Sequence, residues 1–177
     1  LYGWRVLVPR TKEQAAAMSA RLAGHGAIPQ SVPTISVEPP RNPAQMDRAI
    51  KGIVEGRYKW IVFTSVNAVS AVWQKIAELG LDARDFAGVH LAAVGQKTAD
   101  AIRAKGMVPE VMPKATKQNA EGLVEVFPNY VEDIDAVGRV LLPRADIAGE
   151  VLVNGLLDLG WEVDDVVAYR TVRAAPP

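Results

Sequence analysis

The stretch from Tyr58 to Gly80 joins an apolar segment to an amphipathic one through a short polar turn. Trp60–Phe63 is a run of bulky apolar residues, which is typical of a strand buried on both faces of a sheet. After the turn at Thr64 and Ser65, apolar residues recur at helical spacing until Gly80, a residue favoured just beyond a helix end. A strand that leads directly into a helix is typical of a parallel sheet, because parallel strands need such crossovers.

The same succession of strand, turn and helix recurs along the chain. Glycines such as Gly26, Gly56 and Gly106 end the predicted helices. This alternation predicts an α/β fold in which parallel sheets are flanked by helices and the crossovers are right-handed. Besides Trp60–Phe63, we expect strands at Arg5–Val8, Ala27–Val32, His90–Val94, Val108–Met112, Arg139–Leu142 and Glu162–Tyr169.

Local residues also predict a linker and two helix starts. The segment from Pro33 to Pro43 is rich in proline, which has no backbone N–H, so we expect an irregular linker and a domain boundary near Ile35. Asn119 and Asp146 are expected to cap helices, because their side-chain oxygens accept hydrogen bonds from the first N–H groups of a helix.

The composition limits the classes of function. Of the 177 residues, 49% are hydrophobic, which is ample for a packed core. Twenty Lys and Arg balance twenty Asp and Glu, so the broad basic surface of a nucleic-acid or anionic-membrane binder is absent. The lack of cysteine excludes thiolate catalysis and Cys-ligated metal, and it agrees with a cytoplasmic location. No apolar run approaches the roughly 18 residues of a transmembrane helix.

The familiar cofactor and hydrolase motifs are absent. The sequence has no Gly-x-Gly-x-x-Gly, no Walker A loop and no Gly-x-Ser-x-Gly elbow, and His25 and His90 have no second ligand at metal spacing. We therefore expect neither a cofactor nor a metal. In open α/β sheets, ligands bind beyond the carboxyl ends of the strands. Thr64 and Ser65 are therefore expected to border any site.

Six segments occur in an order that carries more information than their periodicity. They are Val8–Thr11, Val62–Val69, Ala93–Ala99, Asn119–Leu123, Leu142–Asp146 and Ala168–Val172. Taken together, and closing on Tyr-Arg-Thr, they resemble the uroporphyrinogen-III synthases, which cyclise hydroxymethylbilane on the route to haem, sirohaem and cobalamin. The resemblance covers nearly the whole chain.

This resemblance implies two flavodoxin-like α/β domains joined by a two-stranded linker, with the first domain built from both ends of the polypeptide. On that basis residues 1–34 are the leading part of domain 1, residues 35–168 form domain 2, and residues 169–177 return towards domain 1. The first domain is then incomplete in this chain, and its remainder is expected beyond residue 177. Members of the family are sometimes fused to a tetrapyrrole methyltransferase, so a covalent fusion is part of the expectation, as is a monomer.

The implied reaction is a cyclising loss of water from hydroxymethylbilane, with inversion of ring D. Tyr169, the tyrosine of the Tyr-Arg-Thr motif, is the preferred acid for departure of the hydroxyl, although a phenol is a weak acid. The substrate carries eight carboxylates, which hydroxyls, cations and the N–H groups of helix N-termini can bind. The predicted substrate-binding residues are Arg10, Thr11, Thr64, Ser65, Asn67, Gly95, Lys97, Thr98, Asn119 and Arg144.

Each of these side chains also has a structural interpretation. Tyr169 can simply pack in the strand ladder that joins the two implied domains, and Ser65 or Asn119 can cap a helix without touching a ligand. Arg10 and Arg144 can form surface salt bridges, and Lys97 can be merely solvated. An alternative from another class is a two-domain module that binds a small anion at the same strand ends without catalysis.

Overall fold

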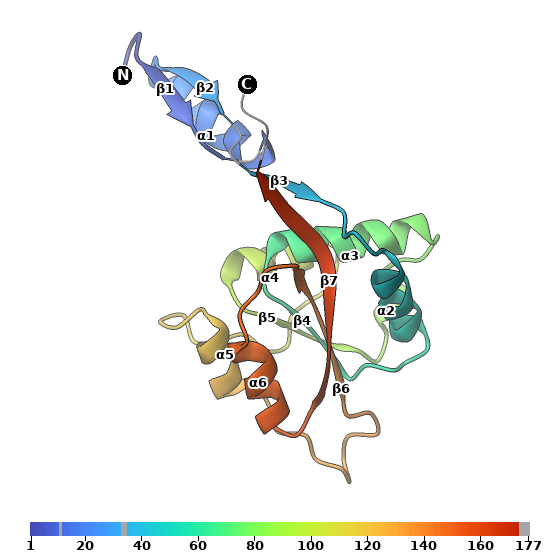
Figure 1. Ribbon diagram of the computed structural model, residues 1–177. Coiled ribbons are helices and arrows are strands. Elements are labelled where there is room, and N and C mark those ends of the chain that lie inside the picture. The colour runs from blue at the N-terminus through green and yellow to red at the C-terminus, as the bar shows by residue number, and fades with distance from the viewer. Residues whose placement is uncertain (11, 33–34, 174–177) are drawn as a thin grey trace. The chain divides into compact units, whose positions relative to one another are not determined.

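Helices and strands alternate along the chain, as the repeated pattern predicts. The computed structural model describes residues 1–10, 12–32 and 35–173 (Figure 1). The contacts between residues divide the chain into two compact units, Leu1–Glu38 with Thr171–Pro177 and Pro39–Arg170. The units are described separately below.

The first unit contains a small parallel sheet. Its strands β1 (Arg5–Val8) and β2 (Ile28–Ser31) pair in parallel, and helix α1 (Lys12–Gly24) lies between them in the sequence. A further strand, β3 (Ile35–Glu38), lies next to β7 (Glu162–Arg173) in the strand order. The expectation of an irregular linker was therefore wrong at Ile35–Glu38. The prolines at positions 39 and 40 follow this strand and end it, so they do not prevent it from forming.

The second unit is built on a parallel sheet in which the strand order is β7, β6, β4, β5. Strand β4 (Trp60–Phe63) lies between β5 (His90–Ala93) and β6 (Arg139–Ala145), and β6 pairs with β7. The helices of this unit are α2 (Ala44–Val54), α3 (Val66–Glu78), α4 (Gln96–Ala104), α5 (Ala120–Val126) and α6 (Val151–Asp158), with a 3₁₀ turn at Ala83–Phe86.

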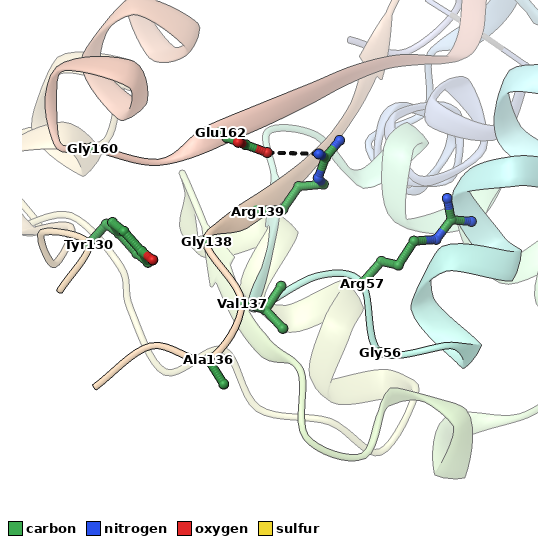
Figure 2. Close-up of a pocket in the computed structure, with 9 residues that line it drawn as sticks. All are labelled: Gly56, Arg57, Tyr130, Ala136, Val137, Gly138, Arg139, Gly160 and Glu162. Carbon is green, nitrogen blue, oxygen red and sulfur yellow. Dashed lines mark hydrogen bonds and ion pairs between the residues drawn. The ribbon is translucent and has the colours of Figure 1, made fainter. Parts of the chain in front are cut away.

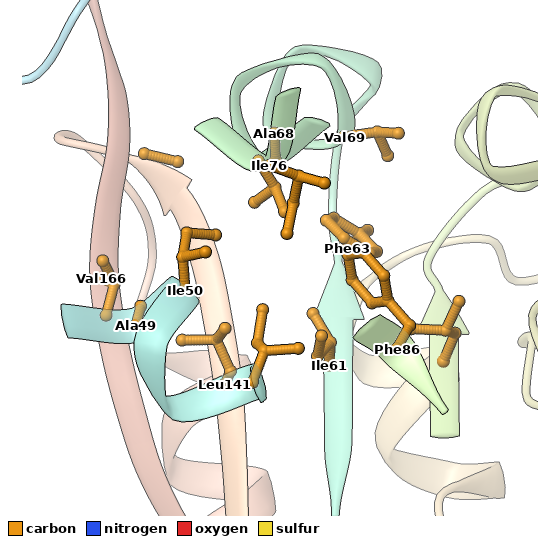
Figure 3. Packing of buried hydrophobic residues seen from close by; sticks show 14 of the residues in the cluster. Ala49, Ile50, Ile61, Phe63, Ala68, Val69, Ile76, Phe86, Leu141 and Val166 are labelled. Carbon is orange, nitrogen blue, oxygen red and sulfur yellow. The ribbon is translucent and has the colours of Figure 1, made fainter. Parts of the chain in front are cut away.

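Alternate residues of the central strands feed two separate cores, as expected for a sheet covered on both faces. Ile61, Phe63 and Leu141 pack with residues of α2, α3 and α4, such as Ile50 and Ile76 (Figure 3). The other face carries Trp60, Val62, Val140 and Leu142, which pack with residues of α5 and α6. Figure 1 shows α5 and α6 side by side on one side of this sheet. The sheet is therefore the middle of three layers.

Strand β6 runs further than its apolar pattern predicts. It continues through Pro143 to Ala145, and beyond Leu141 it pairs with β7 alone. A proline is tolerated where a strand has lost one of its neighbours. The backbone N–H of Asp146 still donates to the Tyr169 carbonyl, at 3.1 Å, so this residue continues the strand ladder. The prediction that Asp146 caps a helix was therefore wrong, and α6 begins after Glu150.

The pairing of β6 with β7 contains an irregularity near its end. Arg144 lies opposite Val167, but the next residue, Ala145, lies opposite Tyr169, so Ala168 is an extra residue in β7. Such a β-bulge changes the face to which the following side chain points. Val166, Ala168 and Tyr169 accordingly all belong to the core on the α3 side of the sheet.

The predicted strand at Val108–Met112 is reduced to a single bridge, in which Val111 pairs with Ala92. Prolines at 109 and 113 flank it, and each removes a backbone donor that a longer edge strand would use. The segment Val108–Met112 therefore adds no regular strand to the sheet.

Tyr58 precedes β4 and is buried in the core on the α3 side of the sheet, where it is hydrogen-bonded to β7. Its hydroxyl donates to Asp164 Oδ2 at 2.7 Å, and Arg139 Nη1 donates to Asp164 Oδ1 at 3.0 Å. Burial, together with the hydrogen bond to the Asp164 carboxylate, raises the pKa of the Tyr58 phenol far above its ordinary value.

This shift predicts an alkaline loss of stability. A phenol whose pKa is raised on folding contributes stability that is complete below its unfolded value of about 10 and is lost as the pH rises above it. Between pH 10 and 11, Tyr58 should therefore cost about 1 kcal/mol of unfolding free energy. Urea unfolding of the wild type and Tyr58→Phe at pH 8 to 11 checks this. We expect a shallower alkaline decline in Tyr58→Phe, and parallel curves would contradict the assignment.

Candidate functional site

The carboxyl edge of the sheet in the second unit is surrounded by helix N-termini. Ser65 caps α3, its Oγ accepting the Ala68 N–H at 3.1 Å, and Asn119 caps α5, its Oδ1 accepting the Gly122 N–H at 2.8 Å. The capping roles predicted for both side chains are confirmed. Gly95 occupies the same position at the start of α4. The positive ends of these helices favour anions at this edge.

Ser65 and Tyr169 form a direct contact at this edge. The Ser65 Oγ lies 2.9 Å from the Tyr169 hydroxyl oxygen, although 104 positions separate the two residues. Tyr169 is only 8% exposed, and its ring belongs to the core on the α3 side. Tyr169 thus lies in a strand, as predicted, but its ring packs in the core of the second unit, and the hydrogen bond holds its phenol oxygen beside the start of α3.

A pocket of about 350 Å³ opens at the same edge, at the ends of β4, β5 and β6. Its walls are mainly apolar, and its polar side chains are those of Thr64, Glu121 and Arg144. The pocket thus brings together two predicted substrate-binding residues, Thr64 and Arg144. The remaining lining residues are Val94, Ala120, Ala148, Gly149, Val151 and Leu152.

Arg144 is held in place by a bidentate ion pair with Asp165, in which the guanidinium is buried and the carboxylate is half-exposed. Its Nε donates to Asp165 Oδ1 at 2.8 Å and its Nη2 donates to Oδ2 at 2.7 Å, while Nη1 donates to the Gly149 carbonyl at 2.6 Å. Arg144 is 6% exposed, so only the Asp165 side of this salt bridge reaches solvent. Three of the five guanidinium donors are used within the protein. The pair therefore orients Arg144 in the pocket wall.

Removing Asp165 should lower the unfolding free energy more than removing Arg144. Asp165→Ala leaves a buried guanidinium without its counter-ion and should lower the unfolding free energy by about 2 kcal/mol. Arg144→Met should cost about 1 kcal/mol, because the half-exposed Asp165 carboxylate regains water. Urea unfolding of both variants checks the order, and a larger loss in Arg144→Met would contradict it.

Three other predicted residues lie on the first turns of α3 and α4. Asn67 is half-buried on α3, Lys97 is exposed on α4, and Thr98 is 5% exposed within α4. Their predicted contacts with substrate stay predictions. Arg10 is exposed directly after β1, in the other compact unit. Thr11 lies outside the described residues.

Gly95 is approached by a side chain that the sequence analysis did not single out. Its φ of −139° is extended backbone that any residue adopts, so its glycine identity is not required by the turn. The Gln96 N–H donates to Gln118 Oε1 at 3.2 Å. Gln118 thus bonds one of the first N–H groups of α4.

Asp165 was also missed, although the sequence contained a signal for it. It is one of two consecutive acidic residues, Asp164 and Asp165, inside a strand that is otherwise largely apolar. An acidic side chain inside a strand calls for a partner, and β6 supplies Arg139 for Asp164 and Arg144 for Asp165.

A larger pocket, of about 590 Å³, lies at the opposite edge of the sheet (Figure 2). Arg139 and Glu162 are the first residues of β6 and β7, and Figure 2 shows their ion pair in its wall, at 2.7 Å. None of the predicted site residues that the structure describes lines this pocket. Because ligands of open α/β sheets bind at the carboxyl ends of the strands, we place the candidate site at the smaller pocket.

Neither metal nor membrane features mark the described part of the chain. Within residues 1–10, 12–32 and 35–173, no group of three or more His, Cys, Asp or Glu side chains is arranged to hold a metal ion. Over the same residues, no helix has the length and apolar character needed to cross a membrane.

Comparison with known proteins gives consistent matches. Residues 16–177 match the family model of uroporphyrinogen-III synthase HemD. The chain is 34% identical over 172 residues to a uroporphyrinogen-III synthase of Synechococcus elongatus, covering 97% of this chain and 62% of that protein. It is 30% identical over 171 residues to the porphyrin biosynthesis protein HemD of Ruminiclostridium josui, covering 97% of this chain and 32% of that protein.

Solved structures agree in fold. A mutant uroporphyrinogen III synthase of Thermus thermophilus superposes with a TM-score of 0.68 at 20% identity, over 97% of this chain and 64% of that one. A second structure of the Thermus thermophilus enzyme gives 0.60 at the same identity and coverage. The chain thus spans less than two thirds of the length of these relatives. Since the family model matches most of the chain, the chain belongs to the uroporphyrinogen-III synthase (HemD) family.

Proposed function

We propose that the full-length protein is a uroporphyrinogen-III synthase, a lyase that cyclises hydroxymethylbilane with loss of water and inversion of ring D. The observation that carries this proposal is the family match over residues 16–177. The name of the Synechococcus elongatus relative supports it. Family membership also favours the enzyme over a binding module without catalysis.

The proposal includes two flavodoxin-like domains joined by a two-stranded linker. We assign residues 1–34 to domain 1, residues 35–168 to domain 2 and residues 169–177 to the return. The two compact units, which divide at Glu38 and at Arg170, support this assignment. The predictions of a monomer, of a cytoplasmic location and of a fusion to a tetrapyrrole methyltransferase stay predictions.

Substrate binding is assigned to the carboxyl edge of the domain 2 sheet. Carboxylates of the substrate bind at the starts of α3 and α4, where N–H groups and the helix dipoles favour negative charge. The adjoining pocket, with Thr64 and Arg144 in its wall, takes a less polar part of the substrate. Holding a flexible chain of four pyrroles in one folded shape lowers the entropic cost of ring closure.

Tyr169 is assigned as the acid. The bond between the hydroxymethyl carbon and its oxygen breaks, and the oxygen leaves as water with the Tyr169 proton. The pyrrole nitrogen supplies the electron pair that stabilises the cationic carbon. After ring closure and inversion of ring D, the ring system loses one proton, which restores the neutral phenol. Water is the only group lost overall.

The test is isomer formation from freshly prepared hydroxymethylbilane. We expect the full-length protein to yield the type III isomer faster than the spontaneous reaction, as measured by chromatographic separation of the oxidised products. Formation of the type I isomer alone, at the spontaneous rate, would show that the protein is not this enzyme.

A further inference from the structure

We propose that Ser65 is a positioning residue for Tyr169. Ser65 donates its hydroxyl proton to the phenol oxygen of Tyr169, and the phenol proton is then directed at the substrate. This inference rests on the proposed function, in which Tyr169 is the acid. It differs from the predicted role of Ser65 as a direct ligand of a substrate carboxylate.

The contacts of Ser65 leave its proton available for this hydrogen bond. A serine hydroxyl has one proton to donate and two lone pairs. One lone pair already accepts the Ala68 N–H at 3.1 Å. The Tyr169 oxygen, at 2.9 Å, is the partner to which the proton of Ser65 can be given. When Ser65 donates, the Tyr169 O–H is left for the departing hydroxyl of the substrate.

The same contacts strengthen the Tyr169 hydroxyl as a hydrogen-bond donor. A hydroxyl that accepts a hydrogen bond becomes a better donor, because hydrogen bonds in a chain polarise one another. The Ala68 N–H belongs to the first turn of α3, where the helix dipole is positive. Negative charge that develops on the phenol oxygen is thus stabilised by Ser65 and, through it, by α3.

Tyr169 needs such a partner because its own strand fixes only part of its geometry. Its backbone is held by the bond between the Asp146 N–H and the Tyr169 carbonyl, and its ring is packed in the core. Rotation of the hydroxyl about the C–O bond is left unspecified by these contacts. The hydrogen bond from Ser65 fixes this rotation. The neighbouring residue, Thr64, lines the pocket instead.

Three substitutions separate hydrogen-bond donation from helix capping. Ser65→Ala removes both roles, Ser65→Asp keeps the capping acceptor but cannot donate when ionised, and Ser65→Thr keeps both. In the full-length protein we expect kcat to fall about 10-fold in Ser65→Ala and Ser65→Asp. KM should change less than about twofold in Ser65→Ala but rise in Ser65→Asp, whose negative charge repels the substrate carboxylates at the start of α3. Ser65→Thr should retain most of the wild-type kcat, and Ser65→Asp should unfold near the wild-type midpoint.

Two controls distinguish positioning from a general structural effect. Asp82→Ala removes a cap from the 3₁₀ turn at Ala83–Phe86, away from Tyr169, and should leave kcat unchanged. In a Tyr169→Phe background, Ser65→Ala should lower kcat no further, because its partner oxygen is gone. Wild-type kcat in Ser65→Asp, a Ser65→Thr protein as slow as Ser65→Ala, or additive losses in the double variant would overturn the proposal.

A measurement without substrate keeps this inference apart from the proposed function. In protein labelled with ¹³C at tyrosine Cζ, the Tyr169 resonance should shift in Ser65→Ala and return towards its wild-type position in Ser65→Thr. An unshifted resonance in Ser65→Ala would refute the hydrogen bond itself. A shifted resonance in a protein that forms no type III isomer would instead overturn the proposed function and, with it, the role in positioning an acid.

Discussion

Replacing Tyr169 with phenylalanine in the full-length protein is expected to lower kcat by about 100-fold, near the lower end of what a general acid contributes. Phenylalanine keeps the ring that packs in the core but removes the proton donor and the bond to Ser65. The protein should therefore stay folded, with a loss of about 1 kcal/mol in unfolding free energy. Initial rates of type III isomer formation at saturating hydroxymethylbilane measure the effect.

Tyr130 offers a matched control for this substitution. It lies in the wall of the pocket at the opposite edge of the sheet and packs against Trp161. Tyr130→Phe should leave kcat within about twofold of the wild type, because no acid role is assigned to it. If Tyr169→Phe turned over as fast as Tyr130→Phe, Tyr169 would not be the acid, whatever the isomer formed.

Replacing Gly122 with alanine is expected to lower the unfolding free energy by about 3 kcal/mol. A Cβ at this position would lie 1.9 Å from the Lys117 carbonyl oxygen, which is backbone and cannot swing aside. The start of α5 would have to move, and the bond between Asn119 Oδ1 and the Gly122 N–H would move with it. Because Ala120 and Glu121 line the smaller pocket, its wall would shift as well.

Gly149→Ala is the control for this second prediction. Gly149 also borders the smaller pocket and has ordinary backbone angles, and a Cβ there would meet nothing within 4 Å. We expect its unfolding free energy to change by less than about 0.5 kcal/mol. Equal losses in the two variants, measured by urea unfolding, would show that steric overlap at Gly122 is not the cause.

Local patterns predicted most of the elements in the second unit. The bounds of β4 follow directly from the apolar run Trp60–Phe63, and Ser65 and Asn119 cap the helices that they precede. These features depend on neighbours within a few residues. The later start of α6 could not be predicted this way, because Asp146 is held in the strand ladder by Tyr169, a residue on another strand.

The contacts between side chains of the candidate site could not be predicted from the sequence. Thr64, Ser65 and Arg144 were placed at strand ends, but the sequence could not show that Ser65 contacts Tyr169 or that Arg144 is bound to Asp165. Both contacts depend on the register in which β6 pairs with β7. The residues next to each strand do not reveal the register between strands that a crossover separates. An acidic residue inside β7 was the one hint available.

The bulge in β7 decides which layer of the molecule contains the side chain of Tyr169, the proposed acid. In a regular strand, Tyr169 would point to the face opposite Ala168, towards α5 and α6. The extra residue reverses that alternation, so the phenol reaches the layer that contains α3 and Ser65. Deleting or adding one residue between Val167 and Tyr169 would thus separate the proposed acid from Ser65 without changing any side chain of the site.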